Sequence, residues 1–142
     1  EFSEHTIDIM LEYGIRYSSN MFDADSPYYL PNRGCPTDIV ELPFAWALDD
    51  APFFLYSGRI PGRFMAAPSA VLETWQREFD GLAAEPSRVF VLAMHPQVIG
   101  RPSRMWLLER FIEHAAANAR TWFARCDEIA EQARERLGAS SR

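Results

Sequence analysis

His95 ends a run of six residues, Val89 to Met94, that carries no charge and no strongly polar side chain. A short run of this kind predicts a strand buried on both faces. A helical pattern follows from residue 102, so strand, loop and helix form one βα unit, which presents functional residues where its strand ends. The imidazole of His95 titrates near neutral pH, which suits a general acid or base. A metal ligand and a capped polar residue at the start of a loop are the alternatives.

A second candidate group combines Trp46 with the acidic pair Asp49 and Asp50, which follow another predicted strand. Together they offer an apolar wall and a carboxylate. A carboxylate beside a histidine raises the pKa of the ring and fixes its tautomer. The group therefore predicts an acid that supports His95, and the alternative for the two aspartates is a solvated turn.

The segment Gly100–Arg104 is a third candidate because it leads into the helix expected from residue 102. Helix N-termini attract anions, and Arg101 and Arg104 add positive charge. Solvent-exposed arginines beside a helix-starting proline are the alternative. His5 and His114 fall on helix faces that we expect to be solvated, and we interpret both as structural. The sequence contains no phosphate-binding loop, dinucleotide fingerprint or His-Glu-x-x-His motif.

Four helices are expected to position these groups. Helical periodicity and capping residues place them at 4–13, 69–84, 102–118 and 127–137. Ser3 and Ser69 are the predicted N-caps of the first two, and Gly14 and Gly138 are the predicted ends of the first and last.

Strands are predicted at 15–19, 38–42, 89–94 and 121–124. Segment 20–36 is predicted to be a loop because it is rich in proline, aspartate, asparagine and glycine, and segment 44–68 a functional loop or lid. Alternating strands and helices in the second half predict a parallel sheet covered by helices. The chain is then either a small open sheet or the C-terminal half of a barrel. We favour the half-barrel because a helix at residue 4 has no strand before it.

The composition indicates a folded protein with an acidic balance, with 48% hydrophobic residues and a net charge of -6 over 142 residues. That charge argues against nucleic acid or an anionic membrane surface as the main partner. No apolar run reaches the roughly 18 residues of a membrane span. Cys35 and Cys126 are too few for a disulfide framework, so we interpret them as free thiols in a reducing compartment. No signal peptide is recognisable, and we expect a cytoplasmic protein.

The order of these motifs resembles the C-terminal half of the polysaccharide deacetylase (NodB-homology) family. The resemblance covers nearly the whole chain. It is closest to the branch that includes peptidoglycan-deacetylase-like proteins and ring-opening amidases such as allantoinase and cyclic imidases. The residues that carry it are Trp46–Asp50 after Glu-Leu-Pro, Leu92–Arg104, and Thr121–Ala124 followed by Glu-Ile-Ala.

This resemblance implies a distorted (β/α) barrel, with parallel strands and outer helices, that hydrolyses an amide C–N bond with a divalent metal, usually zinc. Leu92 and His95 match a Leu-x-x-His motif whose histidine acts as general acid on the leaving nitrogen. Trp46 matches an aromatic residue that lines the substrate pocket, and Asp49 or Asp50 matches the acid that supports the histidine. We also expect Leu92 and Arg101 to contact substrate.

The family's metal ligands and catalytic base belong to an N-terminal half that the 142 residues do not contain. We therefore expect no metal site in this chain, and no activity from the chain alone. Its expected protein partner is that N-terminal half or another copy of the chain. The expected substrate is an N-acetyl sugar or a small cyclic amide or imide, and we prefer the cyclic compound because we expect a cytoplasmic protein. The alternative function is a non-catalytic binding module that kept the pocket and lost the metal.

Overall fold

The computed structural model describes residues 3–56 and 64–140. The chain divides into two compact units. The first holds the residues up to Phe44, the segment Ser87–Val89 and the residues from Phe123 onward, and the second holds Ala45–Pro86 and Phe90–Trp122. Among the described residues, no helix combines the length and the apolar character that crossing a membrane requires.

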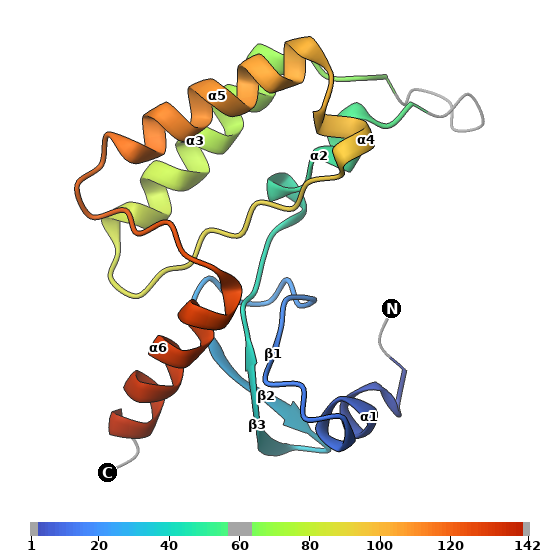
Figure 1. Cartoon of the computed structure of the whole chain (residues 1–142), viewed down its shortest axis with the longest axis vertical. Coiled ribbons are helices and arrows are strands. Elements are labelled where there is room, and N and C mark those ends of the chain that lie inside the picture. The colour runs from blue at the N-terminus through green and yellow to red at the C-terminus, as the bar shows by residue number, and fades with distance from the viewer. Residues whose placement is uncertain (1–2, 57–63, 141–142) are drawn as a thin grey trace. The chain divides into compact units, whose positions relative to one another are not determined.

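The first unit contains a small mixed sheet with the strand order β1-β3-β2 (Figure 1). Its strands are β1 (Tyr17–Ser18), β2 (Tyr28–Asn32) and β3 (Cys35–Glu41). Strand β1 pairs with β3 in parallel, and β2 pairs with β3 in an antiparallel hairpin. The turn residues Arg33 and Gly34 have φ angles of 51° and 82°, the left-handed geometry that two-residue hairpin turns need.

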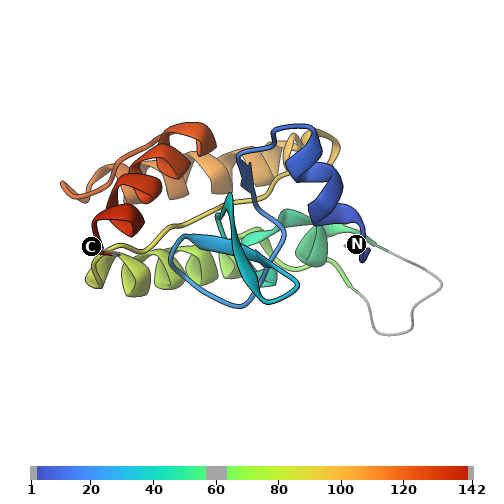
Figure 2. The same ribbon diagram turned by 90° about the horizontal axis from the view of Figure 1, so that it is seen from below.

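Helix α6 (Cys126–Ser140) packs against β1 and β3 in the same unit, which also contains α1 (Thr6–Glu12). Figure 2 shows this sheet from below. One guanidinium joins helix and sheet, because Arg134 donates hydrogen bonds to the carbonyl oxygens of Arg16 and Asp38. The buried apolar side chains of this unit include Leu30, Ile39, Val40, Leu42, Pro43, Val89, Ala130 and Ala133.

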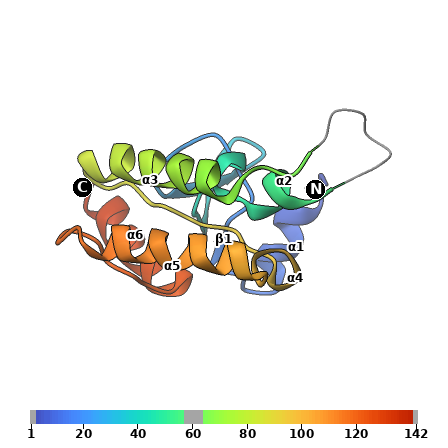
Figure 3. The same cartoon turned by 90° about the horizontal axis from the view of Figure 1, so that it is seen from above.

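The second unit is built on two long helices, α3 (Pro68–Ala84) and α5 (Pro102–Ala116), which lie side by side (Figures 1 and 3). Each helix buries apolar residues four positions apart, which places them on one face. Trp75 of α3 meets Phe111 of α5 edge-on, with ring centroids 5.9 Å apart. The Trp75 indole N–H donates to the carbonyl oxygen of Ala47 at 2.9 Å, so this buried polar group is satisfied.

Three short helical segments complete this unit. They are the 3-10 helix η1 (Trp46–Leu48), α2 (Asp50–Phe54) and α4 (Pro96–Ile99). Segment 90–95 runs in an extended conformation beside the long helices (Figure 3), and its Phe90 ring stacks on Phe111 at 5.2 Å. The apolar core of this unit therefore supports both chain segments that carry the candidate acids and the candidate histidine.

The predicted strand at 89–94 is reduced to a single parallel bridge between Ala93 and Asp49. Two backbone hydrogen bonds form it, from Ala93 N to Leu48 O at 2.8 Å and from Asp50 N to Ala93 O at 3.2 Å. The ladder stops there because η1 precedes the bridge and α2 follows it. The prediction of burial on both faces is also wrong, since only Val89 is buried and Met94 is 42% exposed.

The four predicted helices are confirmed as α1, α3, α5 and α6, with Gly14 in the left-handed conformation directly after α1. Three details are wrong. Ser69 does not cap α3, because Pro68 already occupies its first turn, and Gly138 does not end α6, which continues to Ser140. The N-cap of α1 is His5 and not Ser3, although Ser3 accepts a hydrogen bond from the backbone N–H of His5 and also bonds Thr6, the first residue of the helix.

The strand predictions fare less well. Segments 15–19 and 38–42 are confirmed as β1 and β3, but the predicted loop 20–36 contains β2 and the start of β3. Because β2 is antiparallel, the prediction of an all-parallel sheet is wrong for the described residues. No strand forms at 121–124 either, where Thr121 instead bonds the carbonyls of Ala115 and Asn118 at the end of α5.

The described residues form a mixed α/β arrangement with a small sheet and do not by themselves close a barrel. The predicted functional loop 44–68 contains η1 and α2. Its part at 57–63 lies outside the described residues.

Candidate functional site

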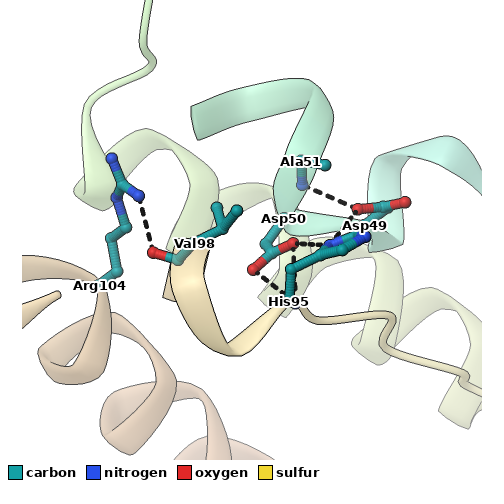
Figure 4. Close-up of polar contacts among 6 residues, drawn as sticks. All are labelled: Asp49, Asp50, Ala51, His95, Val98 and Arg104. Carbon is teal, nitrogen blue, oxygen red and sulfur yellow. Dashed lines mark hydrogen bonds and ion pairs between the residues drawn. The ribbon is translucent and has the colours of Figure 1, made fainter. Parts of the chain in front are cut away.

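Asp50 and His95 meet at the ends of two short helices in the second unit. Asp50 is the first residue of α2, and His95 directly precedes Pro96, the first residue of α4. The ring Nδ1 of His95 lies 2.7 Å from Oδ1 of Asp50, a hydrogen bond (Figure 4). The backbone N–H of His95 also donates to both carboxylate oxygens, at 3.2 and 3.1 Å. One carboxylate thus holds both the backbone and the ring of the histidine.

The two members of this pair differ in exposure. The Asp50 side chain is fully buried, whereas that of His95 is 43% exposed. A buried carboxylate without partners would be costly, and the three contacts from His95 satisfy this one. Because Nδ1 faces Asp50, Nε2 is the ring nitrogen left to exchange a proton with another molecule.

Asp49 has a different task from its neighbour. Its Oδ1 accepts a hydrogen bond from the backbone N–H of Ala51 at 2.8 Å, so Asp49 is the N-cap of α2. The same oxygen lies 3.7 Å from Nδ1 of His95, beyond hydrogen-bond distance. Sequence reasoning left open which aspartate supports the histidine, and the structure pairs Asp50 with it.

The environment of His95 favours its protonated form. The hydrogen bond to Asp50 raises the pKa of His95 above its ordinary value, and the charges of Asp50 and Asp49 raise it further, while desolvation acts in the opposite direction. The ring therefore stays protonated to higher pH than a free histidine, as a group that donates a proton near neutral pH requires.

Asp49, Asp50 and His95 also form a group that could offer three ligand atoms to a metal ion, all within 4.8 Å of one another. The sequence analysis placed no metal site in this chain. Two ligands of a tetrahedral ion, each about 2.0–2.2 Å from it, lie roughly 3.4 Å apart. The 2.7 Å contact between Nδ1 of His95 and Oδ1 of Asp50 is shorter than this and has the length of a hydrogen bond. As arranged, Asp50 and His95 form an acid–histidine pair, with Asp49 beside it.

The other predicted site residues have different surroundings. Trp46 begins η1, three residues before Asp49, and is 61% exposed. Leu92 is half-buried and packs against the apolar core of the second unit, so it supports the segment before His95. Arg101 is exposed at the N-cap position of α5, and its side chain makes no capping bond. The structure thus brings together Asp49, Asp50 and His95 out of the six predicted residues.

Two residues beside the pair received no role there in the sequence analysis. A Cβ at Gly100 would lie 2.6 Å from the carbonyl oxygen of Pro96, so only glycine fits where α4 ends. The guanidinium of Arg104 donates to the carbonyl oxygen of Val98 at 2.7 Å (Figure 4). The Gly-Arg-Pro-Ser-Arg motif was the available signal, but it pointed to anion binding and not to these contacts within the chain.

Comparison with known proteins gives consistent relatives. A curated peptidoglycan deacetylase from Helicobacter pylori is 28% identical over 155 residues, which cover 92% of this chain and 53% of that protein. No protein-family model matches the sequence.

Solved structures agree with this match. A Mycobacterium smegmatis protein whose name assigns it to the polysaccharide deacetylases is 32% identical, with a TM-score of 0.85, over 96% of this chain and 47% of that one. The allantoinase PuuE is 27% identical, with a TM-score of 0.76, over 94% and 44% of the two chains. The chain therefore spans about half the length of the relatives it matches.

Proposed function

Since this chain belongs to the polysaccharide deacetylase family, we propose that it forms part of a hydrolase of amide C–N bonds in which His95 is the general acid. The observation that carries this proposal is the 2.7 Å hydrogen bond between Nδ1 of His95 and the fully buried carboxylate of Asp50. The bond fixes the orientation of the ring and favours its protonated form.

The chemistry assigned to this half is proton delivery. When an amide C–N bond breaks, the departing nitrogen needs a proton, because an amide anion is a very poor leaving group. His95 would supply that proton from Nε2 while Nδ1 stays bonded to Asp50. Trp46 and Arg101 are proposed to contact the substrate, since both are exposed and lie close in sequence to the pair.

The attacking water and its activation are proposed to come from outside this chain. A divalent metal, zinc by the family resemblance, would activate that water when bound. We propose that it is held by the part of the relatives' length that this chain does not span, supplied by the same protein or by another copy. No step here is assigned to a metal on Asp49, Asp50 or His95.

The experiment compares the native full-length protein with its His95→Ala variant on two amide substrates, an N-acetylated glycan oligosaccharide and a small cyclic imide. We expect turnover of one of them to fall by roughly a hundredfold to ten-thousandfold, the usual contribution of a general acid. Metal content should stay unchanged. His5→Ala is the matched control, because His5 belongs to the first unit, is exposed and pairs with the neighbouring Glu4, so its replacement should leave turnover at the wild-type rate.

Three results would contradict the proposal in different ways. Unchanged turnover in His95→Ala would remove the residue from the mechanism. Loss of metal from that variant would make His95 a ligand. If the wild-type protein bound these substrates without hydrolysing them, the chain would belong to a non-catalytic binding module.

A further inference from the structure

The distance between Asp50 and His95 depends on two helices that cannot be stable alone. Helix α2 has five residues and α4 has four, and helices this short do not persist in water without tertiary contacts. Asp50 begins the first and His95 precedes the second. Whatever holds α2 and α4 together therefore also sets the geometry of the pair.

Arg104 contacts both short helices from the first turn of α5. Its Nη1 donates to the carbonyl oxygen of Val98, in α4, at 2.7 Å. Its guanidinium carbon also lies 4.7 Å from the centroid of the Phe54 ring, at the end of α2. Both partners are nearly fully buried, with Val98 2% and Phe54 3% exposed. One cation thus bridges the segments that follow Asp50 and His95.

The guanidinium suits this position for a specific reason. Backbone carbonyls at the end of a helix lack partners within the helix, and an arginine N–H can satisfy one of them. The planar guanidinium can at the same time lie over an aromatic ring while its edge donates hydrogen bonds. A lysine ammonium is a point charge without this plane, so it could reproduce only part of the arrangement.

We propose that Arg104 is a positioning residue that joins α2 to α4 and so keeps Asp50 in contact with His95. It acts through these helices and is not assigned any contact with the reacting atoms. The mechanistic part of the inference rests on the proposed function of His95. The geometric part, that Arg104 sets the contact between Asp50 and His95, does not.

The test uses the native full-length protein with Arg104→Gln, Arg104→Lys and the control Arg110→Gln. Arg110 lies on the same helix and pairs with Glu113 on the surface, away from α2 and α4. The first readout is the pKa of His95, followed by NMR of its ring nitrogens and assigned by the loss of its signals in His95→Gln. The second is turnover and KM against pH.

In Arg104→Gln we expect the pKa of His95 to fall toward its ordinary value and kcat to drop about tenfold to a hundredfold, with little change in KM. The pKa of His95 and kcat in Arg104→Lys should lie between those of Arg104→Gln and wild type. Both quantities in Arg110→Gln should match wild type. If Arg104→Lys folds and Arg104→Gln does not, a pKa of His95 in Arg104→Lys that lies between its ordinary value and the wild-type value supports the inference.

Wild-type titration of His95 in a folded Arg104 variant would overturn the inference, even if that variant were less stable. A lowered pKa in Arg104→Gln together with full activity in His95→Ala would have a different meaning. The geometric inference would then hold while the proposed function of His95 would fail.

Discussion

Replacing Asp50 by asparagine removes the negative charge that faces His95 while leaving the size of the side chain almost unchanged. The carboxylate accepts three contacts from His95, two from its backbone N–H and one from its ring. An asparagine has one acceptor oxygen and can keep only part of this set. The ring then loses both its fixed orientation and the charge that favours its protonated form.

The expected size of the effect follows from the number of charge-assisted bonds lost. Asp50→Asn loses one hydrogen bond between the ring and a carboxylate. Loss of a hydrogen bond to a charged group corresponds to a fall in kcat/KM of roughly tenfold to 150-fold. This is less than expected for His95→Ala, because the imidazole itself remains. Asp49→Asn should have a smaller effect, since asparagine also caps helices well and Asp49 lies 3.7 Å from the ring.

The assay is kcat/KM against pH for the wild-type full-length protein and the two asparagine variants. If protonated His95 is the acid, activity is lost as pH rises through the pKa of His95. Since Asp50 raises that pKa, Asp50→Asn should move this alkaline limb to lower pH and Asp49→Asn should move it less. Equal effects of the two variants, or an unmoved alkaline limb in Asp50→Asn, would refute the assignment of roles to the two aspartates.

Two further predictions concern stability. Gly100→Ala should lower the free energy of unfolding, because the new Cβ would lie 2.6 Å from the Pro96 carbonyl oxygen. Gly81→Ala, its control inside α3, should raise the free energy of unfolding by about 0.5–1 kcal/mol, because a Cβ there meets nothing within 4 Å. Urea denaturation of both variants measures this, and a stabilising Gly100→Ala would contradict the structure. The second prediction concerns pH, because folding raises the pKa of His95 above its unfolded value of about 6.5. The contribution of His95 to the free energy of unfolding is therefore complete below the unfolded pKa. It is lost as pH rises through the pKa of His95 in the folded protein. Wild type should therefore lose its stability advantage over His95→Gln as pH rises, and a pH-independent difference between the two would contradict the contact with Asp50.

The helices could be predicted because their signals are local. In α3 and α5 the buried residues recur every four positions, so the periodicity of the sequence already marks the face that packs. Gly14 likewise marks the end of α1, since the left-handed φ of 66° is inexpensive only for residues such as glycine. Helix ends were less certain, as α6 shows by continuing past Gly138.

The strands could not be predicted equally well because pairing joins residues far apart in the chain. Strand β2 contains Pro31, which reads as a loop residue, yet it is tolerated because β2 lies at the edge of the described sheet. The apolar run before His95 reads as a strand, yet it forms only one bridge because its partner, Asp49, lies between two helical segments.

The sequence by itself determined which residue types were available for proton transfer: one histidine after an apolar run, and two acids after a tryptophan. Tertiary structure alone decided that Asp50 meets the ring, that Asp49 caps α2, and that Arg104 turns inward to Val98 and Phe54. The reason is distance along the chain. Asp50 and His95 are 45 residues apart, and no local propensity encodes which of two adjacent carboxylates the packing of α2 against α4 will bring within 2.7 Å.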